Sequence, residues 1–243
     1  MEPADFIVEM NNISKSFNGV QALKDVSINL KKNEVVGIVG HNGAGKSTLI
    51  KILSGAIRKD SGTILINKSP VDLAGPKVAR NLGIETIYQD LALAGNLDVT
   101  ANFFLGNEKS RYFFLRNSLM REEAKRVLQE LKIRIESYTV PVEFLSGGQR
   151  QRIGIARALY HKPQVLILDE ATSALDNLTE QVVMEAVHNI GKDITIILIA
   201  HRLSTVKECD TIFQLENGEL KGQGSFEKLI EVNEKFRESV AKS

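Results

Sequence analysis

The residues from Gly40 to Thr48 read Gly-His-Asn-Gly-Ala-Gly-Lys-Ser-Thr and match the phosphate-binding pattern G-x-x-x-x-G-K-[ST]. Glycines let the backbone wrap closely around phosphate oxygens, and the following helix start adds unpaired N–H groups and a favourable dipole. We expect Lys46 to neutralise charge on the β- and γ-phosphates and Ser47 to ligate Mg²⁺. The other residues expected to contact the nucleotide here are Asn42, Gly43, Gly45 and Thr48. The alternative is a glycine-rich turn with a surface lysine; the predicted strand before the motif and helix after it favour the phosphate loop.

A second group of candidate residues follows the apolar run Val165-Leu-Ile-Leu, which ends in Asp169 and Glu170. This run predicts a buried strand, and ligands bind at the carboxyl edge of parallel sheets. We expect Asp169 to hold Mg²⁺ through water. Glu170 would act as general base on the attacking water, or polarise it. A solvated strand end is the alternative.

Two further side chains follow predicted strands. His201 comes after the apolar run 194–200, and from there a histidine would contact the γ-phosphate. Gln89 follows a strand-like segment and would reach Mg²⁺ and the water, although a surface glutamine in a turn is the default. The assignment of Gln89 therefore depends on the family resemblance described next.

The stretch Leu145–Gln149 reads Leu-Ser-Gly-Gly-Gln and precedes a predicted helix over 149–160. A serine hydroxyl and glycine N–H groups at a helix start form an anion site, and this one is remote in sequence from the phosphate loop. The chain resembles the ATP-binding cassette (ABC) ATPases over nearly its whole length. The motifs that carry the resemblance occur in the family's order: phosphate loop, Gln89, Leu145–Gln149, Asp169-Glu170, Ser173-Ala-Leu-Asp176 and His201.

The resemblance implies a mechanism in which two domains sandwich two ATP molecules head to tail. Ser146, Gly147 and Gly148 would contact the γ-phosphate held by the partner, and Asp176 would lie at the dimer seam. Phe17 aligns with the aromatic residue that stacks on adenine in this family; packing in the core is its alternative role.

Strands alternating with helices predict an α/β fold with a mostly parallel sheet. The resemblance makes this a P-loop NTPase core with an antiparallel β subdomain and a helical insertion. We expect one ABC domain over 1–243, in which 1–89 and 146–243 form the core and β subdomain and 90–145 the helical subdomain. The predicted strands lie at 6–10, 26–30, 34–40, 63–66, 165–168 and 194–200, and the helices at 48–53, 120–131, 149–160, 179–190 and 226–240. A further strand pair has its turn at Asn217-Gly218.

The composition is that of an ordinary globular domain, with 243 residues, 43% hydrophobic and 25% charged residues, and a net charge of +1. This charge gives no support for a nucleic-acid partner. A soluble ABC ATPase acting on DNA or ribosomes is therefore the less favoured alternative. The acidic start of the chain is not expected to be a signal peptide, and no apolar run reaches the roughly 20 residues that a spanning helix needs.

The two ends of the chain resemble different branches of the family. Residues 6–106 are similar to the ATPases of sugar importers, whereas residues from about 158 onward are similar to the exporter and flippase branch. We therefore hypothesise a recombined or engineered chain joined between Val140 and Val165, with a natural cassette of mixed ancestry as the alternative. In a chimera, misaligned halves would bind ATP with little turnover.

The sequence predicts a Mg²⁺-dependent ATP hydrolase whose cofactors are ATP and Mg²⁺. It would work as a dimer with a second copy and power transport through separate transmembrane permease subunits. We expect it at the cytoplasmic, inner face of the membrane through that permease, with no nucleic-acid partner. Import or export, and the transported substrate, are left open by the sequence.

Overall fold

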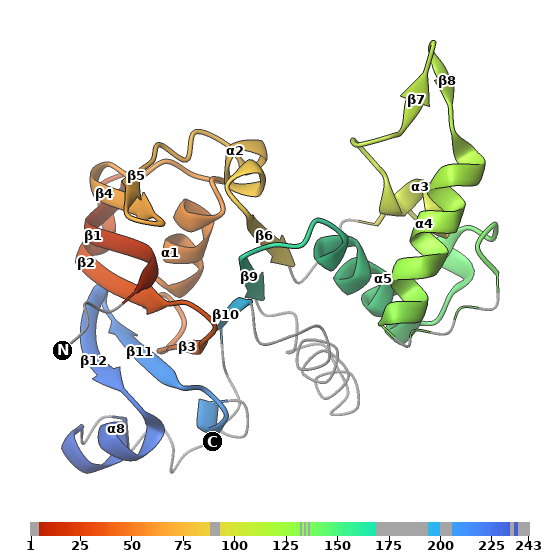
Figure 1. Cartoon of the computed structure of the whole chain (residues 1–243). Helices are drawn as coiled ribbons and strands as arrows, with labels where there is room; N and C mark the ends of the chain where they lie inside the picture. Colours follow the sequence, from red (N-terminus) through yellow and green to blue (C-terminus); the bar gives the residue numbers. More distant parts are fainter. Residues whose placement is uncertain are drawn as a thin grey trace. The chain divides into compact units, whose positions relative to one another are not determined.

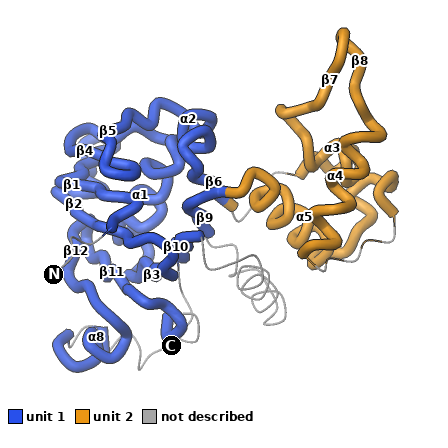
Figure 2. The backbone as a smooth tube through the Cα atoms, in the orientation of Figure 1, with its two compact units in different colours: residues 1–86, 163–170, 193–243 blue, residues 87–162, 171–192 orange. Residues whose placement is uncertain are grey.

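The computed structural model describes residues 5–87, 93–131, 133, 135, 137–168, 194–199, 206–233 and 236–237. The chain divides into two compact units (Figure 2). Unit 1 takes residues 1–86, 163–170 and 193–243, and unit 2 takes residues 87–162 and 171–192. The subdomain bounds expected from the sequence remain a prediction. The expected helix over 179–190 lies outside the described residues.

Unit 1 contains a six-stranded sheet in the order β12-β11-β3-β10-β9-β6 (Figure 1). β3 is paired in parallel with β10 and β11, and β10 in parallel with β9, whereas β12 is antiparallel to β11. All residues of β9 and β10 are buried, as expected for parallel strands covered on both faces. The bounds are β3 Val35–Val39, β6 Ile84–Ile87, β9 Val165–Leu168, β10 Thr195–Ile199, β11 Thr211–Glu216 and β12 Glu219–Gly224.

A second, antiparallel sheet has the order β2-β1-β4-β5. Its strands are β1 Phe6–Phe17, β2 Val20–Lys31, β4 Ser61–Ile66 and β5 Ser69–Pro70. β1 and β2 form one long hairpin, so the two short strands expected at 6–10 and 26–30 are parts of longer ones. Residues of this sheet, of the six-stranded sheet and of helix α1 (Lys46–Leu53) share one hydrophobic core. Helix α2 (Pro76–Asn81) follows β5.

Unit 2 is built around three helices: α3 Val99–Phe103, α4 Asn117–Glu130 and α5 Gly147–Tyr160. Their apolar faces meet in a core of their own. The helices expected at 120–131 and 149–160 are confirmed as α4 and α5, with earlier starts. Between α3 and α4 stand two short strands, β7 (Ser110–Arg111) and β8 (Phe114–Leu115), and the 3₁₀ turn η1 (Val142–Phe144) precedes α5.

The helix expected at the end of the chain is interrupted. The single helix expected over 226–240 is interrupted, because α8 (Phe226–Val232) ends where Asn233 takes an extended backbone with φ −123° and ψ 101°, and residues 236–237 are helical again. The Asn233 side chain explains this break. Its Oδ1 accepts a hydrogen bond from the Phe236 N–H at 3.0 Å, and its Nδ2 donates to Gln214 Oε1 at 2.7 Å. Among the described residues, no helix combines the length and apolar character needed to cross a bilayer.

Candidate functional site

The phosphate loop leaves β3 and leads directly into α1. Lys46, the first residue of α1, is buried, and its Nζ donates to the carbonyl oxygens of Gly40 at 2.7 Å and His41 at 3.0 Å. The loop also closes on itself, because the Ala44 N–H donates to the His41 carbonyl at 3.1 Å. The lysine ammonium therefore lies within the curve of the loop, where the motif predicts it.

Backbone contacts from two other elements hold this loop. The Gly218 N–H, in the β11–β12 turn, donates to the Ala44 carbonyl at 3.1 Å, and the Lys24 N–H of β2 donates to the Gly218 carbonyl at 2.7 Å. The glycines allow this close approach. A Cβ at Gly40, where φ is +150°, would lie 2.2 Å from the Leu215 carbonyl oxygen, and one at Gly45 would lie 2.7 Å from that of Ala22. The loop is therefore shaped by its neighbours in unit 1.

The remaining residues predicted for this loop lie at its outer side and in the first turn of α1. Asn42 and Gly43 are exposed, and Gly43 has φ +82° with open space around it. Ser47 and Thr48 are half-buried in the first turn of α1, which carries no acidic side chain. This arrangement presents N–H groups and hydroxyls at the positive end of a helix, a site suited to anions.

Three strands end beside this loop at one edge of the sheet. Leu198 of β10 is paired with Gly37 of β3 and with Leu168 of β9. Because the three strands are parallel, their carboxyl ends lie together, and the loop follows one of them. In the sequence, the other predicted catalytic and metal-binding residues follow β6, β9 and β10. Those residues lie outside the described part of the chain, as does the seam residue: Gln89, Asp169, Glu170, Asp176 and His201.

Phe17 lies at the end of β1, where it is paired with Val20 of β2. It is 42% exposed, so the alternative role in the core does not fit its position. The Lys15 ammonium lies 5.4 Å from the centre of its ring and also pairs with Asp60 at 2.6 Å. The hydrogen bond from Lys15 is the main reason why the pKa of Asp60 lies below its ordinary value.

The Leu-Ser-Gly-Gly-Gln stretch belongs to unit 2 and opens α5. Ser146 is the N-cap: its Oγ accepts from the Gln149 N–H at 3.2 Å, and the Gln149 Oε1 accepts from the Ser146 N–H at 3.0 Å. This reciprocal pair is a capping box. A Cβ at Gly147 or at Gly148 would meet nothing within 4 Å. The glycines thus leave open space at the start of α5.

Sequence reasoning missed the part of the site that supports the loop. Asn217-Gly218 was recognised as a turn, and its two residues do take the left-handed conformation with φ 51° and 80°. Its contact with Ala44 was not foreseen. The only available signal was the turn motif itself, which carries no information about what the turn touches.

Comparisons with known proteins agree with this geometry. The family profile described as ABC transporter matches residues 23–173. The xylose/arabinose import ATP-binding protein XylG of Sulfolobus acidocaldarius is 40% identical over 237 residues, which cover 95% of this chain and 94% of that protein. The ribose import ATP-binding protein RbsA of Clostridium tetani is 38% identical over 224 residues, but the chain spans only 43% of its length.

Solved structures show the same fold. The ADP conformation of an ATP-binding cassette of an ABC transporter has a TM-score of 0.84 at 26% identity, covering 98% of this chain and 99% of that one. A bacterial Atm1-family ABC exporter with ATP bound has a TM-score of 0.81 at 30% identity, covering 99% of this chain and 43% of that one. The predicted fold class is confirmed.

The hypothesis of a recombined chain is not supported. One natural protein, the Sulfolobus relative, aligns with both ends of this chain in a single match of 237 residues. No comparison shows a junction within the chain.

Proposed function

This chain belongs to the ABC transporter family and is an ATP-hydrolysing cassette, and we propose that it powers sugar import as a head-to-tail dimer. The proposal of sugar import rests on the relatives from Sulfolobus and Clostridium, whose names give xylose, arabinose and ribose as imported sugars. The alternative of a nucleic-acid or ribosome ATPase finds no support among these relatives.

The phosphate loop supports the proposed binding of ATP. We propose that Lys46 moves its ammonium from the Gly40 and His41 carbonyls toward the β- and γ-phosphates, whose oxygens are stronger acceptors. Asn42, Gly43, Gly45 and Thr48 would complete the cradle with backbone N–H groups and side chains. Phe17, exposed at the end of β1, would stack on the adenine ring.

Mg²⁺ fits the residues around this loop. Ser47 offers a hydroxyl oxygen, and Asp169, after β9, offers a carboxylate; both are the oxygen ligands that Mg²⁺ prefers. Gln89 would add an amide oxygen. When bound, Mg²⁺ neutralises charge on the phosphates of the nucleotide.

We propose that Glu170 accepts a proton from the attacking water and that His201 donates a hydrogen bond to the γ-phosphate. Glu170 follows β9 and His201 follows β10; β10 is paired with β3, the strand that precedes the loop, and β9 is paired with β10. Lys46 and His201 would stabilise the negative charge that is spread over the transferred phosphoryl group, which is the main source of catalysis in phosphoryl transfer.

The open start of α5 supports a role in dimerisation. The Ser146 hydroxyl and the N–H groups of Gly147 and Gly148 point to an anion site, and the two glycines have no neighbour within 4 Å that requires them. We propose that this site receives the γ-phosphate held by a second copy and that Asp176 lies at the seam. Transmembrane permease subunits would carry the dimer at the cytoplasmic face of the membrane.

Mixing two inactive variants tests the shared site. Lys46→Ala disables the phosphate loop and Ser146→Arg blocks the start of α5. In a mixed dimer, the loop of the Ser146→Arg chain meets the intact Ser146 of the Lys46→Ala chain. Half of the dimers in an equal mixture are mixed and each regains one of two sites, so about a quarter of the wild-type ATPase rate should return. A mixture as inactive as its components would overturn the shared site.

Glu170→Gln provides the control for hydrolysis. This variant should bind ATP but turn it over very slowly, and the wild-type rate per chain should rise with protein concentration. Unchanged turnover would remove Glu170 from the proposed mechanism. Uptake of labelled ribose and xylose, compared in cells that carry the wild-type or the Glu170→Gln chain, tests sugar import separately from hydrolysis.

A further inference from the structure

The β7–β8 hairpin of unit 2 presents a run of large apolar side chains to solvent. It projects away from α3 and α4 (Figure 1). Tyr112 and Phe114 are each 79% exposed, Phe113 is fully exposed, and Leu115 is exposed as well. Single exposed apolar residues are ordinary on protein surfaces, whereas four in succession form the kind of apolar patch that is typical of interaction surfaces.

The turn of this hairpin is made of residues that are unfavourable for it. Tyr112 and Phe113 both take the left-handed conformation, with φ 49° and 70°. Two-residue turns of this kind favour Asn and Gly, because bulky side chains are strained there. The other two-residue turns among the described strands follow that preference, with Asn at the first position: Asn18-Gly19, Asn67-Lys68 and Asn217-Gly218. The aromatic pair is therefore not explained by turn formation.

The base of the hairpin is held firmly. The Arg116 N–H donates to the Lys109 carbonyl at 2.8 Å, which closes the neck below the two strands. The Lys109 ammonium pairs with both oxygens of Glu123 on α4, at 2.8 and 2.6 Å, and Glu123 also accepts from the Tyr160 hydroxyl on α5 at 2.8 Å. The aromatic tip is thus presented on an ordered support, which lowers the entropy cost of binding.

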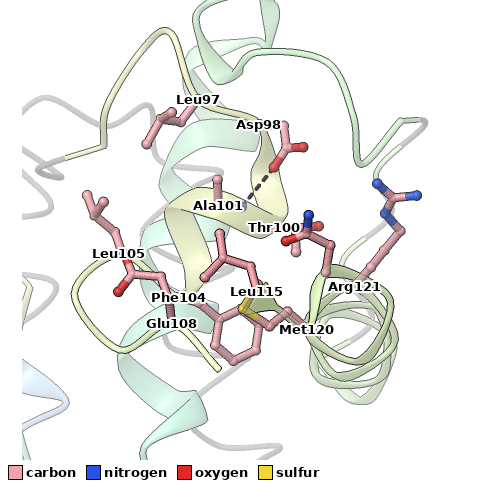
Figure 3. A pocket seen from close by; sticks show the side chains of 11 residues that line it. Leu97, Asp98, Thr100, Ala101, Phe104, Leu105, Glu108, Leu115, Met120 and Arg121 are labelled. Atoms are coloured by element: carbon pink, nitrogen blue, oxygen red, sulfur yellow. Dashed lines mark hydrogen bonds between the residues drawn. The ribbon is translucent and has the colours of Figure 1, made fainter. Parts of the chain in front are cut away.

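The same segment is basic. Residues 109–121 contain Lys109, Arg111, Arg116 and Arg121 and no acidic residue, although the whole chain has 31 basic and 30 acidic residues. Within the described part of the chain, the three arginines have no carboxylate partner, and Arg111 lies 5.2 Å from the centre of the Tyr112 ring. Arg121 lines a pocket of about 340 Å³ together with Leu105 and Leu115 (Figure 3). Asp98 and Glu108 line the same pocket and Lys109 is paired with Glu123, so the exposed cationic groups nearest the apolar tip are Arg111 and Arg116.

We propose that this hairpin inserts its aromatic tip into the interface of an anionic lipid bilayer. Aromatic rings favour the headgroup region, and arginines are attracted by anionic lipids. A lipid surface suits the shape better than a protein does. A specific protein interface uses about 20–30 residues on each side, whereas the hairpin is a convex projection spanning residues 110–115. A soft bilayer can surround such a tip. The inference concerns a surface outside the ATP site and does not require hydrolysis.

The absence of tryptophan from the chain allows a direct test. Phe113→Trp places a single fluorophore at the tip, and Val232→Trp places one at an apolar position that is 70% exposed on α8. Vesicles contain phosphatidylglycerol and phosphatidylcholine in equal parts, at low salt and without ATP. The emission of Phe113→Trp should shift to the blue and become protected from iodide, whereas that of Val232→Trp should not change. Neutral phosphatidylcholine vesicles should give a much weaker response.

Variants that lack either the aromatic rings or the arginines test these two contributions to vesicle binding separately, and co-sedimentation with vesicles measures the binding. Tyr112→Asn with Phe113→Gly removes the aromatic rings but installs the pair that this turn prefers, so the hairpin is retained; binding should fall about tenfold or more. Arg111→Gln with Arg116→Gln should weaken binding to anionic vesicles by about fivefold for each arginine lost. Val232→Ser and Arg58→Glu, at exposed positions elsewhere, should leave binding unchanged. The aromatic double variant should keep the ATPase rate in solution.

Three outcomes would overturn the proposal. The first is wild-type chain that fails to sediment with anionic vesicles at low salt. The second is binding that persists unchanged in the Tyr112→Asn, Phe113→Gly variant. The third is a tip fluorophore that becomes protected as protein concentration rises without lipid, which would identify a second copy of the chain as the occupant.

Discussion

The phosphate loop of unit 1 and the start of α5 in unit 2 are both glycine-rich helix starts, yet glycine meets a different requirement in each. At Gly40 and Gly45, a Cβ would collide with backbone carbonyls of neighbouring strands. At Gly147 and Gly148, it would meet nothing. The loop is completed by its own unit, whereas the start of α5 depends on a local capping box and leaves space beyond it. The difference supports the proposal that the start of α5 receives a group from outside the unit.

The largest expected effect is the loss of ATP hydrolysis when the lysine of the phosphate loop is replaced. Lys46→Ala should lower the ATP hydrolysis rate by roughly 10²–10³-fold, because it removes a buried ammonium from the place where phosphate charge develops. Phosphate release measures the rate. Lys51→Ala, exposed on the last turn of the same helix, is the control and should have little effect. A Lys46→Ala rate close to that of wild type would show that the backbone of the loop suffices.

Alanine substitutions at matched glycines test the comparison between the phosphate loop and the start of α5. Gly40→Ala should destabilise the fold by about 3 kcal/mol or more, because its Cβ would lie 2.2 Å from the Leu215 oxygen at φ +150°. Gly147→Ala should raise stability by up to about 1 kcal/mol, since alanine favours helix and open space surrounds it. It should nevertheless slow hydrolysis at high protein concentration. Urea unfolding and ATPase assays measure both; equal destabilisation by the two changes would contradict the comparison.

Two N-cap serines give a smaller, paired effect. Ser146 caps α5 in unit 2 and Ser225 caps α8 in unit 1, where its Oγ accepts from the Lys228 N–H at 3.4 Å. Replacing either by alanine should cost about 1 kcal/mol of stability. Only Ser146→Ala should also lower the ATPase rate. If Ser225→Ala slowed hydrolysis equally, the loss would reflect stability alone.

The smallest effect is the pH dependence of two carboxyl groups. Burial raises the pKa of Glu34 in unit 1, so its contribution to stability is present below its ordinary pKa of 4.5 and is lost as pH rises through the folded value. The hydrogen bond from Lys109 lowers the pKa of Glu123 in unit 2, so its contribution is present above 4.5 and is lost as pH falls through the folded value.

Urea unfolding between pH 3 and 7 can therefore separate the two groups. Relative to wild type, Glu34→Gln should gain stability as pH rises, and the deficit of Glu123→Gln should shrink as pH falls. Both differences should be about 1 kcal/mol or less, because Glu123 and Lys109 remain partly exposed. Trends of the same sign in both variants would contradict the assigned pKa directions.

The sequence predicts those parts of the fold that depend on local patterns of apolar and polar residues. Continuous apolar runs predicted β9 and β10, and helical periodicity predicted α4 and α5. The end of α8 was not accessible, because Asn233 leaves the helix in favour of a hydrogen bond to Gln214, a residue of β11. The β7–β8 hairpin was also missed, since Tyr112-Phe113 carries none of the residues that normally signal a turn.

The sequence by itself determined the chemistry of the site. The phosphate loop and the Leu-Ser-Gly-Gly-Gln stretch are each continuous in sequence, and the types and spacing of their residues predict that both contact phosphate. Only the tertiary structure decided how the loop is held. The Gly218 turn, the Leu215 carbonyl and β2 come from distant parts of the chain and contact it through backbone atoms. These contacts are made by backbone N–H and carbonyl groups, which are common to nearly all residues. No pattern of side chains in the sequence therefore predicts them.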